Sequence, residues 1–137
     1  MSIFDKPLPR LKGLAGEWYG FAKQHDLRMQ RCTNCGTWRH LPREMCANCG
    51  SFDWEWAKVS GKGKIYTFTV TYAPFHPAYF NDPFPYAVVI VELEEGVRMQ
   101  TNVVDYDQTK LEIGMPVEVY YDDVNENVTL VKWKVAK

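Results

Sequence analysis

The sequence predicts a mainly β protein with one N-terminal helix, and three patterns support this prediction. All four cysteines lie between residues 32 and 49, as two Cys-x-x-Cys pairs. From residue 66 onward, apolar and polar residues alternate in short segments, which is typical of β-strands. Between residues 11 and 25 the apolar residues instead recur at helical spacing. With 46% apolar residues and a formal net charge of -1, the chain does not have the composition of a disordered protein.

The distribution of charge divides the chain near residue 60. Residues 1–60 hold every cysteine and nine basic against six acidic side chains, whereas residues 61–137 hold seven basic against eleven acidic ones. The Gly and Ser residues at 60–63 are typical of a turn between two units. We therefore expect an extended segment with an amphipathic helix at 1–30, a cysteine-bearing unit at 31–60 and a β unit at 61–137.

The predicted helix has one apolar stripe. Its members are Leu11, Leu14, Ala15, Trp18, Phe21 and Ala22. Such a stripe packs against something, either the protein's own β structure or another chain. Trp18 and Tyr19 are candidates for contact with a partner, because aromatic side chains are favoured at interfaces. The sequence leaves both alternatives open.

The two cysteine pairs predict a structural zinc site in a small ribbon. Four thiolates are a complete tetrahedral ligand set for zinc, and the candidate ligands are Cys32, Cys35, Cys46 and Cys49. A dithiol redox site is the rival interpretation, but it requires one exposed pair rather than two matching pairs. Paired disulfides would conflict with a reducing compartment. A ribbon of this size needs the metal, because it is too small to fold by apolar burial alone.

The C-terminal half predicts five strands, at about residues 66–72, 86–93, 97–104, 117–121 and 129–135. The first would have one strongly aromatic face, with Tyr66, Phe68 and Tyr72 on the same side. Five strands with a longer connection between the third and fourth predict a small OB-type barrel. A sandwich would usually need about seven strands.

The loop between the first two of these strands is unusually apolar for a connection. It contains Phe75, His76, Tyr79 and Phe80. These residues either cap the open end of the barrel or form a lip that contacts an apolar ligand or partner. His76 has no identifiable partner that would mark it as an acid or base.

Taken together, these features resemble the domain-of-unknown-function 35 family, over almost the whole chain. The landmarks that match are the residues entering the first cysteine pair (27–32), Pro42 with Arg43 before the second, Trp56, residues 60–63, Pro85 with Tyr86, Gly96 and residues 113–115. Ala47 departs from the proline that many members have inside the second pair, which leaves the pair intact. The resemblance implies a rubredoxin-like zinc ribbon followed by an OB-fold.

The resemblance also implies a function. Family members typically pair with thiolase-superfamily proteins and support acyl-CoA binding or complex assembly, while the partner's cysteine and histidine carry the chemistry. We therefore expect a non-catalytic auxiliary subunit of an acyl-CoA-processing complex, or a scaffold without a ligand of its own. Coenzyme A would need cations near its phosphates, and the candidates are Arg39, Arg43, Lys62 and Lys64.

The residues themselves agree with a chain that is not catalytic alone. All four cysteines are assigned to zinc, so none is left as the thiolate nucleophile that thiolase-type acyl transfer needs. The sequence contains neither a GxSxG elbow nor a GxxxxGK[ST] phosphate loop.

A module that binds single-stranded nucleic acid is the alternative function, because stacking aromatics on an OB-fold serve that purpose. The excess of acidic residues in the barrel half argues against it, since phosphate neutralisation dominates such binding. No apolar run approaches the length of a membrane span and no signal-peptide h-region is present. We therefore expect no nucleic acid, no membrane and a cytoplasmic location.

Overall fold

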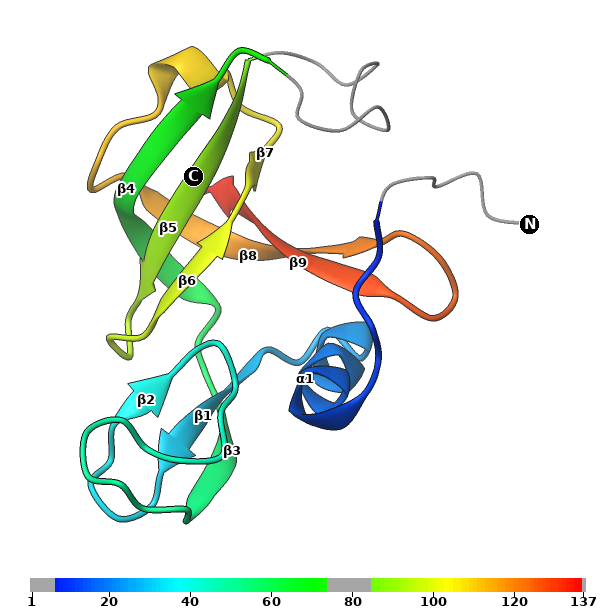
Figure 1. Ribbon diagram of the computed structural model, residues 1–137. Helices are drawn as coiled ribbons and strands as arrows, with labels where there is room; N and C mark the ends of the chain where they lie inside the picture. The colour runs from blue at the N-terminus through cyan, green and yellow to red at the C-terminus, as the bar shows by residue number, and fades with distance from the viewer. Residues whose placement is uncertain (1–6, 74–84, 137) are drawn as a thin grey trace.

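The computed structural model describes residues 7–73 and 85–136, which form one helix and two β-sheets (Figure 1). Helix α1 spans Gly13–Lys23. The smaller sheet has the strand order β2-β1-β3, with β1 at Arg28–Cys32, β2 at Trp38–Arg39 and β3 at Trp54–Lys58. The larger sheet has the order β6-β5-β4-β8-β9-β7. Its strands are β4 (Lys62–Thr71), β5 (Tyr86–Leu93), β6 (Arg98–Thr101), β7 (Val103–Val104), β8 (Pro116–Asp123) and β9 (Thr129–Val135).

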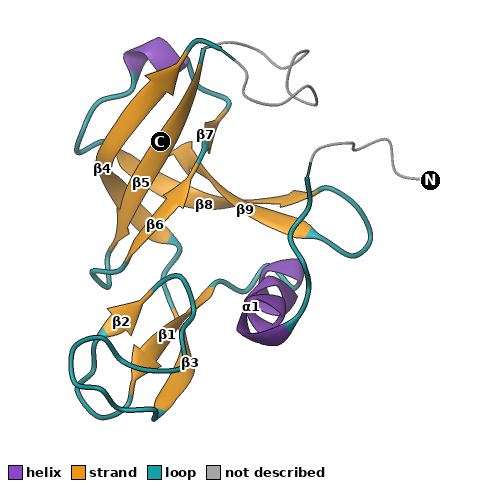
Figure 2. Ribbon diagram, in the orientation of Figure 1, coloured by secondary structure: helices purple, strands orange, loops and turns teal. Residues whose placement is uncertain are grey.

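Strands dominate the secondary structure, and a short 3-10 helix at Gln108–Lys110 lies in the connection before β8 (Figure 2). The prediction of a mainly β protein with an N-terminal helix, a ribbon and an OB-fold is therefore confirmed. The predicted strands at 86–93 and 129–135 coincide with β5 and β9. The long connection between the third and fourth predicted strands is the segment that contains the 3-10 helix.

Helix α1 packs against its own chain, between the ribbon and the barrel (Figure 1). It begins after Lys12, whose backbone is extended, and ends at Lys23. Gln24 caps it, and His25 beyond the cap has a left-handed conformation with φ of 57°. Trp18 and Ala22 are buried, and the ring of Phe21 lies edge-on to Trp56 of β3 with centroids 5.7 Å apart. The C-terminal part of the apolar stripe therefore packs within this fold, which was one of the two alternatives left open by the sequence, whereas Leu11 and Ala15 of the same stripe are exposed.

The larger sheet curves into a barrel whose strands are antiparallel except for β7 and β9. Strand β4 is the longest and pairs with both β5 and β8. Gly63 lies where β4 presses closest on β5, because a Cβ atom at this position would lie 2.5 Å from the Glu92 carbonyl oxygen. Any side chain here would force the two strands apart.

Asn102 is the point at which one chain segment passes from one edge of the sheet to the other. It alone separates β6, which pairs with β5, from β7, which pairs with β9. Its carbonyl oxygen accepts a hydrogen bond from the Trp133 amide at 3.0 Å, and its side-chain Nδ2 donates to the Ala87 carbonyl at 2.9 Å. The sheet is not closed by a continuous ladder, but Asn102 ties its two edges together.

The expected aromatic face of the first barrel strand is interrupted. The pairing of β4 with β5 shifts register between Ile65 and Thr67, which is the signature of a β-bulge at Tyr66. Ile65 is buried and Phe68 is partly buried, whereas Tyr66 is 42% exposed. The guanidinium of Arg98 lies 3.8 Å from the Tyr66 ring centroid on the outer face. Because of the extra residue, Tyr66 points to the outer face of the barrel whereas Phe68 packs against the core. Tyr72 lies beyond the end of β4 and is exposed.

One hydrophobic core joins all three parts of the chain. Trp133 of the barrel and Met29 of the ribbon are both 0% exposed, and the cluster also contains Trp18 of the helix. Leu27, between α1 and β1, and Val59, between β3 and β4, belong to the same cluster. The backbone amide of Leu27 also donates to the Tyr121 hydroxyl at 3.0 Å. The ribbon and helix are thus anchored on the barrel.

Candidate functional site

The two cysteine knuckles have the same local structure. In each, the amide of the glycine that follows the second cysteine donates to the carbonyl of the first: Gly36 to Cys32 at 2.9 Å and Gly50 to Cys46 at 2.8 Å. Both glycines have left-handed backbones, with φ of 77° and 78°. This conformation is strained for other residues, and it bends each Cys-x-x-Cys segment so that both sulfurs face one point.

The four sulfurs converge as a zinc site requires. All lie within 4.8 Å of one another, and the Cys32–Cys49 and Cys35–Cys46 Sγ pairs are each 3.6 Å apart. Ligands at the corners of a zinc–thiolate tetrahedron are about 3.8 Å apart, since each Zn–S bond is ~2.3 Å. The same separation is far longer than a disulfide bond of about 2.0 Å. The cysteines therefore fit a structural zinc ion, and all four are free of disulfides.

Polar groups around the sulfurs favour the thiolate that binds zinc. The Thr37 hydroxyl, 3.1 Å from Cys35 Sγ, and then the Asn48 amide lower the pKa of this thiol to about 5. With four thiolate ligands the site is closed, so its chemistry is structural rather than catalytic.

The asparagine before the second cysteine of each knuckle reaches across to the other knuckle. Asn34 Nδ2 donates to Cys49 Sγ at 3.4 Å, and Asn48 Nδ2 donates to Cys35 Sγ at 3.5 Å. Our reading of the sequence did not identify this role. The repeated Cys-x-Asn-Cys-Gly pattern was the signal that could have shown it.

Arg39 and Arg43, two candidates for contact with coenzyme A, lie together on the ribbon. Arg39 donates from Nε to the Gln30 side-chain oxygen at 2.8 Å and from Nη2 to the Arg43 carbonyl at 2.6 Å. The Arg43 amide donates to the same Gln30 oxygen at 2.6 Å. Both arginines line a pocket of about 460 Å³ that also includes His40 and Leu41.

Lys62 and Lys64, the other two candidate cations, lie apart from the arginines on β4. They line a second pocket of about 540 Å³, together with Glu92, Glu94 and Glu118. Three carboxylates against two ammonium groups make this pocket net negative. Its surroundings therefore suit a phosphate less well than those of Arg39 and Arg43 do.

Trp18 and Tyr19 line a third pocket, where the helix, the ribbon and the barrel meet. This pocket measures about 260 Å³ and includes His40 of the ribbon and Val131 of β9. Trp18 is only 6% exposed, and its ring lies edge-on to Tyr19, with centroids 4.9 Å apart. Burial lowers the pKa of His40 to about 4, so its imidazole is neutral at pH 7.

The candidate loop residues Phe75, His76, Tyr79 and Phe80 lie outside the described residues.

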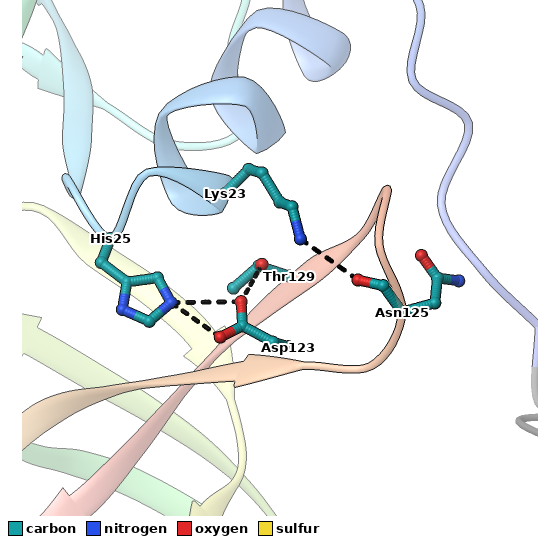
Figure 3. A network of polar contacts seen from close by, with 5 residues as sticks. All are labelled: Lys23, His25, Asp123, Asn125 and Thr129. Atoms are coloured by element: carbon teal, nitrogen blue, oxygen red, sulfur yellow. Dashed lines mark hydrogen bonds and ion pairs between the residues drawn. The ribbon is translucent and has the colours of Figure 1, made fainter. Parts of the chain in front are cut away.

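A polar network that our sequence reading missed joins the end of α1 to the β8–β9 hairpin (Figure 3). His25 Nε2 lies 2.9 Å from Asp123 Oδ2, and the Thr129 hydroxyl donates to the other oxygen of the same carboxylate. Lys23 Nζ donates to the Asn125 carbonyl at 3.2 Å. The hydrogen bond from Thr129, and then the one from His25, lower the pKa of Asp123. These contacts hold the helix exit against the barrel.

Two family models match adjoining parts of the chain. The ChsH2 rubredoxin-like zinc ribbon domain matches residues 21–55, and the ChsH2 C-terminal OB-fold domain matches residues 56–122. Within the described ranges, no helix is long and apolar enough to cross a membrane. The cytoplasmic location stays a prediction.

Curated relatives include subunits and scaffolds. The "Probable enoyl-CoA hydratase alpha subunit" of Thermomonospora curvata is 40% identical over 131 residues, which are 96% of this chain but only 40% of that protein. A "DUF35 domain-containing scaffold protein" of Methanocaldococcus jannaschii is 37% identical over 89% of this chain and 86% of its own length. The "Benzoylsuccinyl-CoA thiolase subunit BbsA" of Geobacter metallireducens is 28% identical over 81% of this chain and 74% of its own.

Among solved structures, a chain of the "Ltp2-ChsH2(DUF35) aldolase" superposes with a TM-score of 0.82 at 39% identity. The match covers 95% of this chain and 100% of that one. The backbone fold of this chain is therefore similar to that chain over its whole length.

Proposed function

Because this chain belongs to the DUF35 family, with the zinc ribbon and OB-fold domains of ChsH2, we propose that it is a non-catalytic subunit of an acyl-CoA-processing complex. We propose further that its catalytic partner is a thiolase-superfamily protein. The observation that carries the proposal is the match to the full length of a chain in the Ltp2-ChsH2(DUF35) aldolase.

The chemistry of the site supports an auxiliary role. Thiolase-type acyl transfer requires a free cysteine thiolate as nucleophile. All four cysteines of this sequence face one another at zinc-ligand distances, and a closed site of four thiolates has no position for a substrate. A partner would therefore supply the nucleophile.

The names of the relatives support the same proposal. One is a thiolase subunit, one a hydratase alpha subunit and one a scaffold protein, so similar chains occur within acyl-CoA complexes and as scaffolds. Within the thiolase superfamily, an aldolase partner would fit the relatives as well as a thiolase does, and the partner's reaction is an outcome of the experiment below.

The nucleic-acid alternative gains no support from the aromatic residues of β4. The Tyr66 ring is covered by Arg98, which also donates to Glu92 at 3.1 Å. A base would have to displace this cation from the ring, in the half of the chain where acidic residues exceed basic ones.

The test is to purify the tagged full-length protein from its native cells, identify what accompanies it by mass spectrometry and measure the stoichiometry by native mass. We expect a thiolase-superfamily protein in a fixed ratio. The reconstituted pair should process an acyl-CoA substrate that neither protein processes alone. The proposal would be overturned if the chain were recovered alone. It would also be overturned if the chain were recovered only with bound nucleic acid that nuclease treatment removes.

A further inference from the structure

The four cysteines of the zinc site differ in exposure, and the difference repeats in the two knuckles. The first cysteine of each knuckle, Cys32 or Cys46, is only 1% exposed. The second, Cys35 or Cys49, is exposed. Each exposed cysteine lies against a buried cysteine of the other knuckle, because the two pairs of sulfurs that are 3.6 Å apart both cross between the knuckles. The site therefore consists of two similar facing pairs, each with one exposed and one buried cysteine.

Each facing pair has the features of an oxidation-sensitive pair of thiols. Cysteines bind zinc as thiolates, and the thiolate is the form that reacts as a nucleophile. Reactivity toward peroxide increases with thiolate character and exposure, and a second cysteine in contact converts the first product into a disulfide. Cys35 and Cys49 are the exposed thiolates, and the buried cysteine that faces each of them is close enough to close the bond.

Backbone contacts of the ribbon favour bonds between the knuckles. The Thr33 amide donates to the Asp53 carbonyl at 3.0 Å, and the Cys46 amide donates to the Ser51 carbonyl at 2.8 Å. These contacts join the first knuckle to the segment that follows the second, so the facing sulfurs are neighbours while a first disulfide forms. Each facing pair has to approach by about 1.5 Å to reach the length of a disulfide. The first bond then holds the knuckles together while the second forms.

We propose that the ribbon is a modification site for hydroperoxides, at which oxidation replaces the zinc ion with two disulfides, Cys32–Cys49 and Cys35–Cys46. The proposal concerns the zinc ligands alone and does not depend on the proposed function. In the first step an exposed thiolate attacks one peroxide oxygen and the O–O bond breaks. The sulfur becomes a sulfenic acid, and the other oxygen takes up a proton and leaves as water. In the second step the facing thiolate attacks the sulfenic sulfur, the S–S bond forms, and the sulfenic oxygen takes up a proton and leaves as water.

The electrons and the ligands balance. Each disulfide takes two electrons from two thiolates, and one peroxide molecule is reduced to two water molecules with the uptake of two protons. Two peroxide molecules therefore convert all four ligands, and zinc is released because a disulfide sulfur is no longer the thiolate that binds it. Both new bonds cross between the knuckles, so they connect the two halves of the ribbon as the metal did. Bonds within each Cys-x-x-Cys segment would leave the knuckles unconnected.

The test is oxidation of the zinc-loaded full chain with hydrogen peroxide, with zinc release measured by a chromogenic chelator and disulfides mapped by mass spectrometry. After free thiols are alkylated and the chain is denatured, trypsin cleaves between the knuckles at Arg39 and Arg43 and leaves them in separate peptides, residues 32–39 and 44–58. We expect loss of zinc together with one cross-linked species that contains both peptides, paired as proposed. Two separate peptides with internal disulfides, or any other pairing, would overturn the proposal, as would four free thiols in excess peroxide.

The oxidised ribbon should keep its fold without the metal. In the NMR spectrum of the oxidised, zinc-free chain, the amide signals of β1–β3 should stay dispersed. Chelation of zinc from the reduced chain is the control, and it should collapse the same signals because nothing then connects the knuckles. A dithiol reductant added together with zinc should restore the native spectrum. Collapse of the ribbon signals in the fully cross-linked chain would overturn the replacement of the metal by the two disulfides.

Two matched variants test the attack on the zinc-bound thiolates. A limiting amount of N-ethylmaleimide should label Cys35 and Cys49 of the zinc-loaded chain before the buried cysteines. Asn34→Ala removes the donor to Cys49 and should raise the ratio of label at Cys49 to label at Cys35 about two- to fivefold, the effect of losing one hydrogen bond. Asn48→Ala removes a donor to Cys35 and should lower the same ratio by a similar factor.

First labelling at a buried cysteine would overturn the proposal. A ratio that neither variant changes would mean that the thiols react only after zinc has left, and it would overturn the attack on the zinc-bound thiolates.

Discussion

The ribbon and the barrel are stabilised by different physics, although they share one core. In the ribbon, two short knuckles, each closed by a local backbone hydrogen bond, bring four sulfurs together. In the barrel, strands far apart in sequence surround a buried Trp133. The ribbon therefore depends on a metal ion, whereas the barrel depends on apolar burial. The predictions that follow test this difference, from the largest expected effect to the smallest.

Loss of zinc should unfold the ribbon and leave the barrel folded. Cys46→Ser removes one of four ligands, and zinc binding contributes about 10–16 kcal/mol in zinc-finger peptides. We expect one zinc ion per chain in the native protein and none in the variant, measured by metal analysis. In the NMR spectrum the amide signals of β1–β3 should collapse, while those of β5 and β9 stay dispersed.

Chelation of zinc from the native protein, followed by its return, serves as the control for this variant. The ribbon signals should disappear and reappear. A Cys46→Ser chain that retains the native ribbon spectrum without metal would show that the ribbon does not depend on zinc. Loss of the barrel signals together with the ribbon would show that the two units fold as one.

Truncation of the barrel core should destabilise the protein without loss of zinc. Trp133 is fully buried, so Trp133→Ala leaves a large cavity that costs about 3–5 kcal/mol of unfolding free energy, measured by urea denaturation. Trp133→Phe, which leaves a smaller cavity, should cost less. The zinc content of both folded variants should equal that of the native protein. Destabilisation below about 1 kcal/mol would contradict this account of the core.

Asn34 and Asn48, each of which donates a hydrogen bond to a sulfur of the other knuckle, should contribute equally to the retention of zinc. Asn34→Ala and Asn48→Ala each remove one hydrogen bond to a sulfur, an effect of about 1 kcal/mol or about fivefold in the rate of zinc transfer to a competing chelator. Asn127→Ala, in the β8–β9 turn, is the matched control and should release zinc at the native rate. Very unequal effects of the two variants would disprove the symmetry of the site.

The smallest effect concerns the network that joins the helix to the barrel. The pKa of Asp123 is lowered in the folded state, chiefly by Thr129, so its carboxylate stabilises the fold above its unfolded pKa of about 4. This stabilisation is lost as the pH falls through the folded pKa. The difference in unfolding free energy between the native protein and Asp123→Asn should therefore be largest near neutral pH and shrink below about pH 4.

Both the native protein and Asp123→Asn lose zinc at acid pH, because protons compete with the metal for the thiolates. This loss is the same in both proteins, so it cancels in the difference between their unfolding free energies. A difference that stays constant from pH 3 to pH 7 would mean that the Asp123 carboxylate has no net role in stability.

Local patterns predicted the elements of the fold well, because they depend on residues close in sequence. The cysteine spacing identified both knuckles, and the alternation of apolar residues identified β5 and β9. The bulge at Tyr66 escaped prediction, since a shift of register depends on the partner strand and leaves the alternation of the sequence unchanged. The role of Asn102 escaped for the same reason, since its contacts lie on β5 and β9.

The candidate site was only partly predictable. Arg39, Arg43, Lys62 and Lys64 were equivalent in sequence, each a cation near the junction of the two units. In the structure, the arginines lie in a pocket without carboxylates, whereas three glutamates surround the lysines. Trp18 was a candidate for partner contact, and the structure buries almost all of its surface within this chain. The neighbours that decide these roles come from distant parts of the sequence.

The sequence by itself determined the candidate zinc ligands and the positions of β5 and β9, because the Cys-x-x-Cys turns and the two-residue period of a strand are local properties. Only the tertiary structure decided which side chains share a pocket, which charges remain unpaired and which face of a strand is buried. Those properties are set by contacts between segments up to a hundred residues apart, such as His25 with Asp123. Packing, rather than local preference, therefore decided these properties.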